Sequence, residues 1–245
     1  MKISILTLFP EMFDGPFAHS IIRRAIEKKI VSIEFINIRK FGIGKHKKVD
    51  DKTYGGGVGM VMRVDVLDRA IQFALRNEVP PRTRCHLVRR RVILLDPQGK
   101  IFTQRGAKRL SKISHLILVC SHYEGTDERL REMVDEEISI GDYILTGGEI
   151  PALVLADSII RLLPKALGKK ESAQKESFQE FLIGNKRQKL LEYPQYTRPD
   201  EYNGLKVPKI LLSGNHKKIA KWRKSQAVKR TQKRRPDLLL KTTRD

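Results

Sequence analysis

The hydrophobic pattern of the first two thirds of the chain switches repeatedly between two periods. Short apolar runs rich in β-branched residues are typical of buried strands, and they occur at 3–9, 92–95 and 116–120. A strand is also expected where Val31, Ile33 and Phe35 alternate with polar neighbours. Apolar residues at helical spacing predict helices at 21–29, 64–75, 103–112, 127–134 and 152–163. This rhythm predicts an α/β domain with a mainly parallel sheet.

Three glycine-bearing segments follow predicted strands. DPQG is expected to end a strand with a turn at 96–99, and the other two segments are SHYEG (121–125) and GDYILTGG (141–148). In parallel sheets ligands bind beyond the carboxyl ends of the strands, and glycine lets the backbone approach them closely. We therefore expect a ligand site there. The sequence has no GxGxxG motif after the first strand, no Walker A motif and no metal-spaced His/Cys group, which disfavours a standard dinucleotide fold.

The last third of the chain has a different character. Residues 168–189 are polar and charged, and they are predicted to form a linker or lid with little strand signal. Basic helices are expected from residue 190, with a helix cap at 213–215. We thus predict three parts: an α/β domain at 1–167, the linker at 168–189 and a basic helical domain at 190–245.

Charge points to a polyanionic partner. The chain carries 49 Lys and Arg against 28 Asp and Glu, a formal net charge of +21. More than half of this excess lies at 205–245, which holds 14 basic residues and two acids. Such a surplus favours nucleic acid. An ordinary basic surface is the alternative.

Cysteine use and hydropathy set the expected compartment. The two cysteines cannot build a disulfide framework, and Cys120 ends an apolar run, which predicts a buried thiol. No leader-like segment and no apolar stretch of roughly 18 residues is found. The sequence therefore predicts a cytoplasmic protein.

Seven segments in fixed order carry a family resemblance. They are LFPEMF, VDDKTYGGGVGM, LDPQG, YEGTDER, DEEISIGDYILTGGE, YTRP and LLSGNH. In them the chain resembles the bacterial tRNA (guanine-N1-)-methyltransferases of the SPOUT superfamily. The resemblance implies a parallel α/β sheet with a deep trefoil knot, plus a small helical C-terminal domain. It also implies S-adenosylmethionine as methyl donor, a homodimer with active sites between subunits, and 1-methylguanosine at tRNA position 37 as product. A Mg²⁺ requirement is implied too, although no protein site for this ion can be identified in the sequence.

The resemblance also assigns site residues. Glu176 matches the family's catalytic Asp and Arg161 its catalytic arginine; their alternatives are a charged linker residue and a helix-surface residue. RNA contacts are expected at His46, Asp50, Gly59, Arg198, Lys217 and Lys221. Contacts to S-adenosylmethionine are expected at Leu95, Pro97, Ser121, Tyr123, Glu124, Gly125, Ile140, Gly141, Asp142, Tyr143, Ile144, Leu145, Gly147, Gly148 and Pro151.

Four positions depart from the family pattern. Glu176 replaces Asp, Ser121 replaces Gly, His122 replaces Arg and Val58 replaces Pro. Two alternatives therefore stay open beside guanosine-37 methylation. The first alternative is a non-catalytic RNA-binding relative, and the second is a SPOUT methyltransferase that acts on another RNA base.

Overall fold

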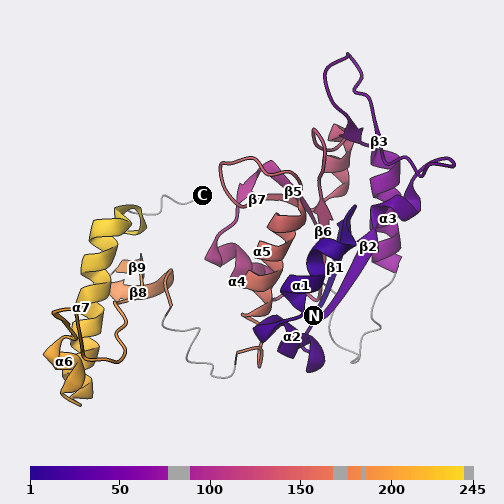
Figure 1. Cartoon of the computed structure of the whole chain (residues 1–245). Coiled ribbons are helices and arrows are strands. Elements are labelled where there is room, and N and C mark those ends of the chain that lie inside the picture. The colour runs from indigo at the N-terminus through magenta and orange to yellow at the C-terminus, as the bar shows by residue number, and fades with distance from the viewer. Residues whose placement is uncertain (77–88, 168–175, 184–185, 240–245) are drawn as a thin grey trace. The chain divides into compact units, whose positions relative to one another are not determined.

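The computed structural model describes residues 1–76, 89–167, 176–183 and 186–239 (Figure 1). The chain divides into two compact units, Met1–Gly168 and Lys169–Asp245. Among the described residues, no helix is long and apolar enough to cross a membrane.

A five-stranded sheet forms the centre of the first unit. Its strands lie in the order β2-β1-β6-β5-β7, and each neighbouring pair is parallel. The sheet confirms the predicted α/β class. Its strands are β1 (Lys2–Thr7), β2 (Ser32–Asn37), β5 (Arg90–Ile101), β6 (His115–Cys120) and β7 (Glu136–Ser139).

Helices cover both faces of this sheet (Figure 1). Successive strand residues point to opposite faces, so in β6 Leu118 joins one apolar cluster and Val119 the other. On one face lie α2 (Ser20–Glu27), α4 (Gln104–Leu110) and α5 (Glu149–Ile160); on the other lies α3 (Val64–Arg76). Because both faces are buried, the strands show continuous apolar runs.

The shorter elements complete the first unit. They are η1 (Pro10–Phe13), α1 (Asp14–Phe17), η2 (Ile38–Phe41), β3 (Asp50–Asp51), β4 (Val61–Met62) and η3 (Glu128–Met133). Strands β3 and β4 pair antiparallel and flank the glycine-rich YGGGVGM segment.

Two sequence-based expectations about local structure were wrong. The segment DPQG does not end its strand, because β5 continues to Ile101 with a register shift between Leu95 and Lys100. A bulge of this kind re-aims the chain without ending the pairing. The predicted helix at 127–134 is the 3-10 helix η3, which Asp127 caps through its side chain. The trefoil knot stays a prediction.

The second unit combines two small hairpins with helices. Strands β8 (Gln179–Ile183) and β9 (Lys186–Leu190) pair antiparallel, so the weak strand signal expected for 168–189 was misleading. The role of that segment as a lid stays a prediction. The other elements are β10 (Glu201–Tyr202), β11 (Leu205–Lys206), α6 (Lys209–Leu212), α7 (His216–Arg234) and η5 (Pro236–Leu238).

Helix α7 organises the second unit. Asn215 caps its N-terminus by accepting a hydrogen bond from the Lys218 amide at 3.1 Å. The buried Thr231 hydroxyl accepts from the Leu191 amide at 2.9 Å and so ties the helix to the end of β9. Ile219 and Ala227 are also buried, whereas most of the lysines on this helix are exposed. Helix α7 therefore packs against the rest of the second unit through a narrow apolar stripe, and its opposite side is a basic surface.

Candidate functional site

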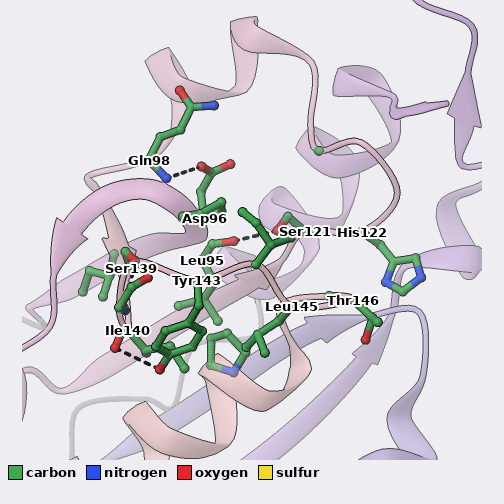
Figure 2. A pocket seen from close by; sticks show the side chains of 18 of the residues that line it. Leu95, Asp96, Gln98, Ser121, His122, Ser139, Ile140, Tyr143, Leu145 and Thr146 are labelled. Atoms are coloured by element: carbon green, nitrogen blue, oxygen red, sulfur yellow. Dashed lines mark hydrogen bonds between the residues drawn. The ribbon is translucent and has the colours of Figure 1, made fainter. Parts of the chain in front are cut away.

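A cavity of about 390 Å³ lies between three irregular segments, namely the bulge of β5 at 96–99 and the loops that follow β6 and β7. We call it the loop cavity (Figure 2). Its size falls in the range of small-molecule sites, about 300–1,000 Å³. Three loops line it, together with the first turns of α5: Leu95, Asp96, Pro97, Gln98, Ser121, His122, Tyr123, Glu124, Gly125, Ile138, Ser139, Ile140, Gly141, Tyr143, Ile144, Leu145, Thr146, Gly147, Gly148 and Pro151.

Hydrogen bonds tie the three loops together. The Ser121 hydroxyl donates to the Leu95 carbonyl at 2.7 Å, which joins the second loop to the first (Figure 2). The Gly148 amide donates to the Ser121 carbonyl at 2.8 Å, and His122 bridges Gly147 in antiparallel fashion. The third loop is thus held against the second, and the cavity is set by backbone pairing.

Glycine is required where the third loop meets the end of β6. A Cβ at Gly148 would lie 2.6 Å from Cys120 Cα and 2.8 Å from the Ser121 nitrogen, both backbone atoms. A Cβ at Gly147 would lie 2.5 Å from His122 Nδ1 and 2.5 Å from Glu149 Oε2. Contacts under 3 Å force atoms apart, so the third loop can lie this close to the end of β6 only because glycine has no side chain.

Polar groups on the first and third loops hold their turns. The carboxylate of the buried Asp96 accepts from the Gln98 amide at 2.8 Å (Figure 2). In the third loop, the Ser139 hydroxyl accepts from the Gly141 amide at 3.2 Å, and the Tyr143 hydroxyl donates to the Ile140 carbonyl at 3.2 Å. These bonds fix the turns of the two loops.

The cavity walls suit an adenosine-like ligand. Ile140, Leu145 and Pro151 give an apolar surface, and Leu145 is still 37% exposed. Loop backbones beside them can hydrogen-bond a base edge, since each non-proline residue carries one donor and one acceptor. The arrangement can therefore hold a flat heterocycle and its ribose.

A buried acid and thiol lie beneath the cavity. Glu149 is 2% exposed and accepts from the Thr7 hydroxyl at 2.7 Å. Cys120 is fully buried as predicted, and burial, followed by the nearby Glu149 charge, raises the pKa of its thiol well above the usual range. A thiol kept neutral in this way is a packing residue.

The structure brings together nearly all the residues expected to contact the methyl donor. Fourteen of the fifteen line the loop cavity; Asp142 is exposed in the third loop and does not line it. Six further lining residues were missed, namely Asp96, Gln98, His122, Ile138, Ser139 and Thr146. All six lie within or next to the motif segments, so their positions in the sequence could have indicated them.

The two residues expected to act on the base lie in different units. Arg161 is half-buried at the C-cap of α5, where its amide donates to the Asp157 carbonyl at 3.1 Å. Glu176 is half-buried in the second unit and precedes β8. Neither belongs to the described residues that line the loop cavity.

The residues expected to contact RNA divide between the units. In the first unit His46 is exposed, Asp50 is half-buried in β3, and Gly59 packs so closely on Glu124 that a Cβ would lie 2.4 Å from Glu124 Cγ. In the second unit Arg198, Lys217 and Lys221 are exposed. Gly59 therefore places the glycine-rich YGGGVGM loop beside the loop cavity.

No metal centre is evident in the described part of the chain. Among the described residues, no group of three or more His, Cys, Asp or Glu side chains is placed to hold a metal ion. Mg²⁺ is often held by one or two carboxylates together with substrate phosphates, so this finding concerns only a site that the protein would form alone.

Comparison with known proteins identifies the family. A family model described as tRNA (Guanine-1)-methyltransferase TrmD matches residues 1–241. A tRNA (guanine-N(1)-)-methyltransferase of Carboxydothermus hydrogenoformans is 52% identical over 240 residues, covering 98% of this chain and 87% of the relative. A protein of the same name from Halalkalibacterium halodurans is 52% identical over 241 residues, covering 98% and 91%.

A third relative covers the same span. The tRNA (guanine-N(1)-)-methyltransferase of Endomicrobium trichonymphae is 49% identical over 241 residues, which are 98% of this chain and 100% of the relative. Both units of the structure are therefore included in the similarity. The chain belongs to the tRNA (guanine-1)-methyltransferase TrmD family.

Proposed function

We propose that this protein transfers a methyl group from S-adenosylmethionine to N1 of guanosine 37 of tRNA. The observation that carries the proposal is the loop cavity, where three loops from adjacent parallel strands bring fourteen of the expected donor-binding residues together. The family supports the reaction, because the relatives above are named for guanine-N1 methylation of tRNA. The basic surface of α7 supports a polyanionic substrate.

The cavity fits the methyl donor in shape and chemistry. Gly147 and Gly148 let the third loop approach the end of β6 closely, and Ile140 and Leu145 provide an apolar wall for adenine. When bound, S-adenosylmethionine supplies an electrophilic methyl group on a positively charged sulfur. The residues of the three loops would hold it, orient it and exclude water from it.

We assign the proton transfer to Glu176. Guanine N1 carries a proton at neutral pH and is then a poor nucleophile, so a base must remove it. A carboxylate in that role contributes about 10²–10⁴ in rate. The two carboxylate oxygens of Glu176 can accept this proton as the N1–C bond forms.

We assign charge stabilisation to Arg161. Removal of the N1 proton places negative charge on O6 of the guanine ring. A guanidinium donor aimed at such a developing charge contributes about 10²–10³ in rate. Arg161 stays charged at any physiological pH, which suits this role.

The proposal has four further parts. We propose a homodimer with shared active sites, a location in the cytoplasm where tRNA matures, and the division of the chain into a catalytic domain, a lid and a tRNA-binding domain. We also propose that turnover requires Mg²⁺, which a chelator titration tests directly.

The decisive experiment is transfer of a labelled methyl group to two tRNA transcripts at saturating donor. One transcript carries guanosine at position 37 and the other adenosine. We expect label on the first transcript only, recovered as 1-methylguanosine. Binding of tRNA without transfer would indicate a non-catalytic relative, and equal labelling of both transcripts would indicate another target base.

A further inference from the structure

The second unit contains a cavity of its own, of about 280 Å³. We call it the second-unit cavity. It is lined by residues 194–198, by Asp200 and Val207, by Leu211 and Leu212 of α6, and by Arg223 of α7. It shares no lining residue with the loop cavity, so it is not part of the methyl-donor site.

The side chain of Arg223 lies against an aromatic ring and has one N–H donor without a hydrogen-bond partner among the described residues. Its guanidinium carbon lies 4.7 Å from the centre of the Tyr193 ring, within the range of a cation–π contact. Its Nε is buried and has no hydrogen-bond partner among the described residues. Buried donors are nearly always paired in proteins, so Arg223 is a side chain of this cavity whose hydrogen bonding is incomplete.

Aromatic and apolar side chains form an exposed part of the wall. Tyr196 is 49% exposed and Leu212 is 61% exposed, although both line a cavity. The Tyr196 ring centre lies 6.4 Å from that of Trp222. An exposed aromatic ring beside arginine side chains is a feature with which proteins bind unstacked RNA bases.

One acid stands out on this basic unit. Asp200 lines the cavity together with Arg198 and Arg223. A carboxylate accepts hydrogen bonds and cannot donate them when ionised. Guanine presents two adjacent donors, N1–H and the N2 amino group, which match the two oxygens of a carboxylate. The arginines can reach the phosphate or the O6 acceptor.

We propose that the second-unit cavity binds one unpaired guanosine nucleotide of the tRNA. Its base stacks on Tyr196, Asp200 accepts from its N1–H and N2–H groups, and Arg198 and Arg223 contact its acceptor oxygens. The proposal rests on tRNA being the substrate, as proposed above. It adds a base-specific contact to a unit whose lysines alone would provide affinity without sequence choice.

Trp222 allows a direct test, because it is the only tryptophan in the chain. The full-length protein is titrated with two single-stranded hexanucleotides, one all uridine and one with a central guanosine, while tryptophan emission is followed. We expect the guanosine oligomer to change the emission and to bind more tightly. Equal binding of both oligomers would overturn the choice of guanine, and no change in emission with either would overturn the site.

Variants of Tyr196 test the stacking contact. We expect Tyr196→Ala to weaken guanosine-oligomer binding by about 5- to 150-fold, the range for loss of one base–aromatic stack. Tyr196→Phe keeps the ring and is expected to bind like the wild type, which separates stacking from folding. Tyr202→Ala, on an aromatic that is 66% exposed and does not line the cavity, is the matched control. Equal binding by Tyr196→Ala and Tyr202→Ala would refute the proposal.

A variant of Asp200 tests base choice. Asp200→Asn should lower the preference for guanosine over adenosine by about 10-fold, within the range for one good bidentate pair. Glu201→Gln is the control, because this neighbouring acid lies 3.3 Å from Lys206 and does not line the cavity. An unchanged preference in Asp200→Asn would contradict the proposed reading of the base edge.

Failure of this proposal can be told apart from failure of the proposed function. Methyl transfer to guanosine-37 tRNA is measured on the same wild-type preparation. Guanosine-oligomer binding without any transfer would refute the function and leave the second-unit cavity as a base-binding site. Methyl transfer without oligomer binding would refute guanosine binding at the second-unit cavity and leave the proposed function unaffected.

Discussion

The two cavities of this protein are built in different ways. The loop cavity is made by backbone turns that are paired to one another, and its key positions are glycines, such as Gly147 and Gly148, that admit no side chain. The second-unit cavity is made by side chains, notably Tyr196, Asp200 and Arg223. A backbone-built site should tolerate changes of side chain and fail when a Cβ is added. A site built from side chains should behave in the opposite way.

The comparison also separates binding from chemistry. Changes at the loop cavity should affect the methyl donor and leave RNA binding intact, whereas changes at the second-unit cavity should do the reverse. Glu176 and Arg161 line neither cavity, so their loss should affect turnover while both binding functions remain.

The largest effect is expected for Glu176→Gln. Removing the proposed base should lower kcat by about 10²–10⁴. The affinities for S-adenosylmethionine and tRNA should stay near those of the wild type, as measured by calorimetry and filter binding. Glu180→Gln, a change of an exposed acid on β8, is the matched control. Full activity of Glu176→Gln would show that another group removes the proton.

The next effect is expected for Arg161→Ala. Loss of a guanidinium at the developing O6 charge should lower kcat by about 10²–10³. The Kd for tRNA should change far less, because the role concerns the transition state. Single-turnover rates and tRNA Kd are measured on the same preparation. Equal losses in rate and affinity would assign Arg161 to binding only.

A smaller effect is expected for Gly148→Ala. The added Cβ meets backbone atoms of Cys120 and Ser121 at 2.6 and 2.8 Å. Overpacking of this kind costs about 1–3 kcal/mol, which corresponds to roughly 5- to 150-fold weaker donor binding if the cost falls on the cavity. Titration calorimetry with S-adenosylmethionine measures the loss, and tRNA affinity is expected to be retained.

Gly106→Ala is the matched control for that variant. Gly106 lies in α4 of the same unit, and its Cβ would meet only the Phe102 and Thr103 side chains, at 3.4 Å or more. Alanine is favoured over glycine in a helix by about 1 kcal/mol, so stability should hold or rise. Donor binding equal to that of Gly148→Ala would argue against a cavity set by close backbone approach.

The smallest effect concerns pH and Cys120. Burial raises the pKa of this thiol in the folded protein, so above pH of about 8.5 the unfolded chain loses the proton first. The free energy of unfolding should therefore fall as pH rises, by at most about 1.4 kcal/mol per unit from this group. Urea unfolding at pH 8 and pH 10 measures the fall, which should be smaller in Cys120→Ala. An equal fall in that variant would assign it to other groups.

The architecture of the first unit could be predicted from the sequence. A continuous apolar run such as that of β6 is typical of a strand whose two faces are both covered in a parallel sheet. Apolar residues at helical spacing correctly predicted α3 and α5. The passage of β5 through DPQG could not be predicted. Proline and glycine usually end a strand, and here the pairing with β7 overrides that local preference beyond the bulge.

The two sites differ in how far the sequence revealed them. The loop cavity was predictable, because glycine-bearing motifs at strand ends mark a backbone-built site and the family resemblance supplied its ligand. Asp142 was the exception, since a residue between two lining neighbours can still face solvent. The second-unit cavity was not predicted, apart from Arg198 as an RNA contact. Tyr196, Asp200 and Arg223 meet only through tertiary packing, which no local period encodes.

Amide hydrogen exchange with and without S-adenosylmethionine tests the central claim most directly. The claim is that the methyl donor lies among the bulge of β5 at 96–99 and the loops that follow β6 and β7. The account predicts added protection at 95–98, 121–125 and 138–148, with none at 194–212. Protection confined to the second unit, or absent from these three loops at saturating donor, would contradict it.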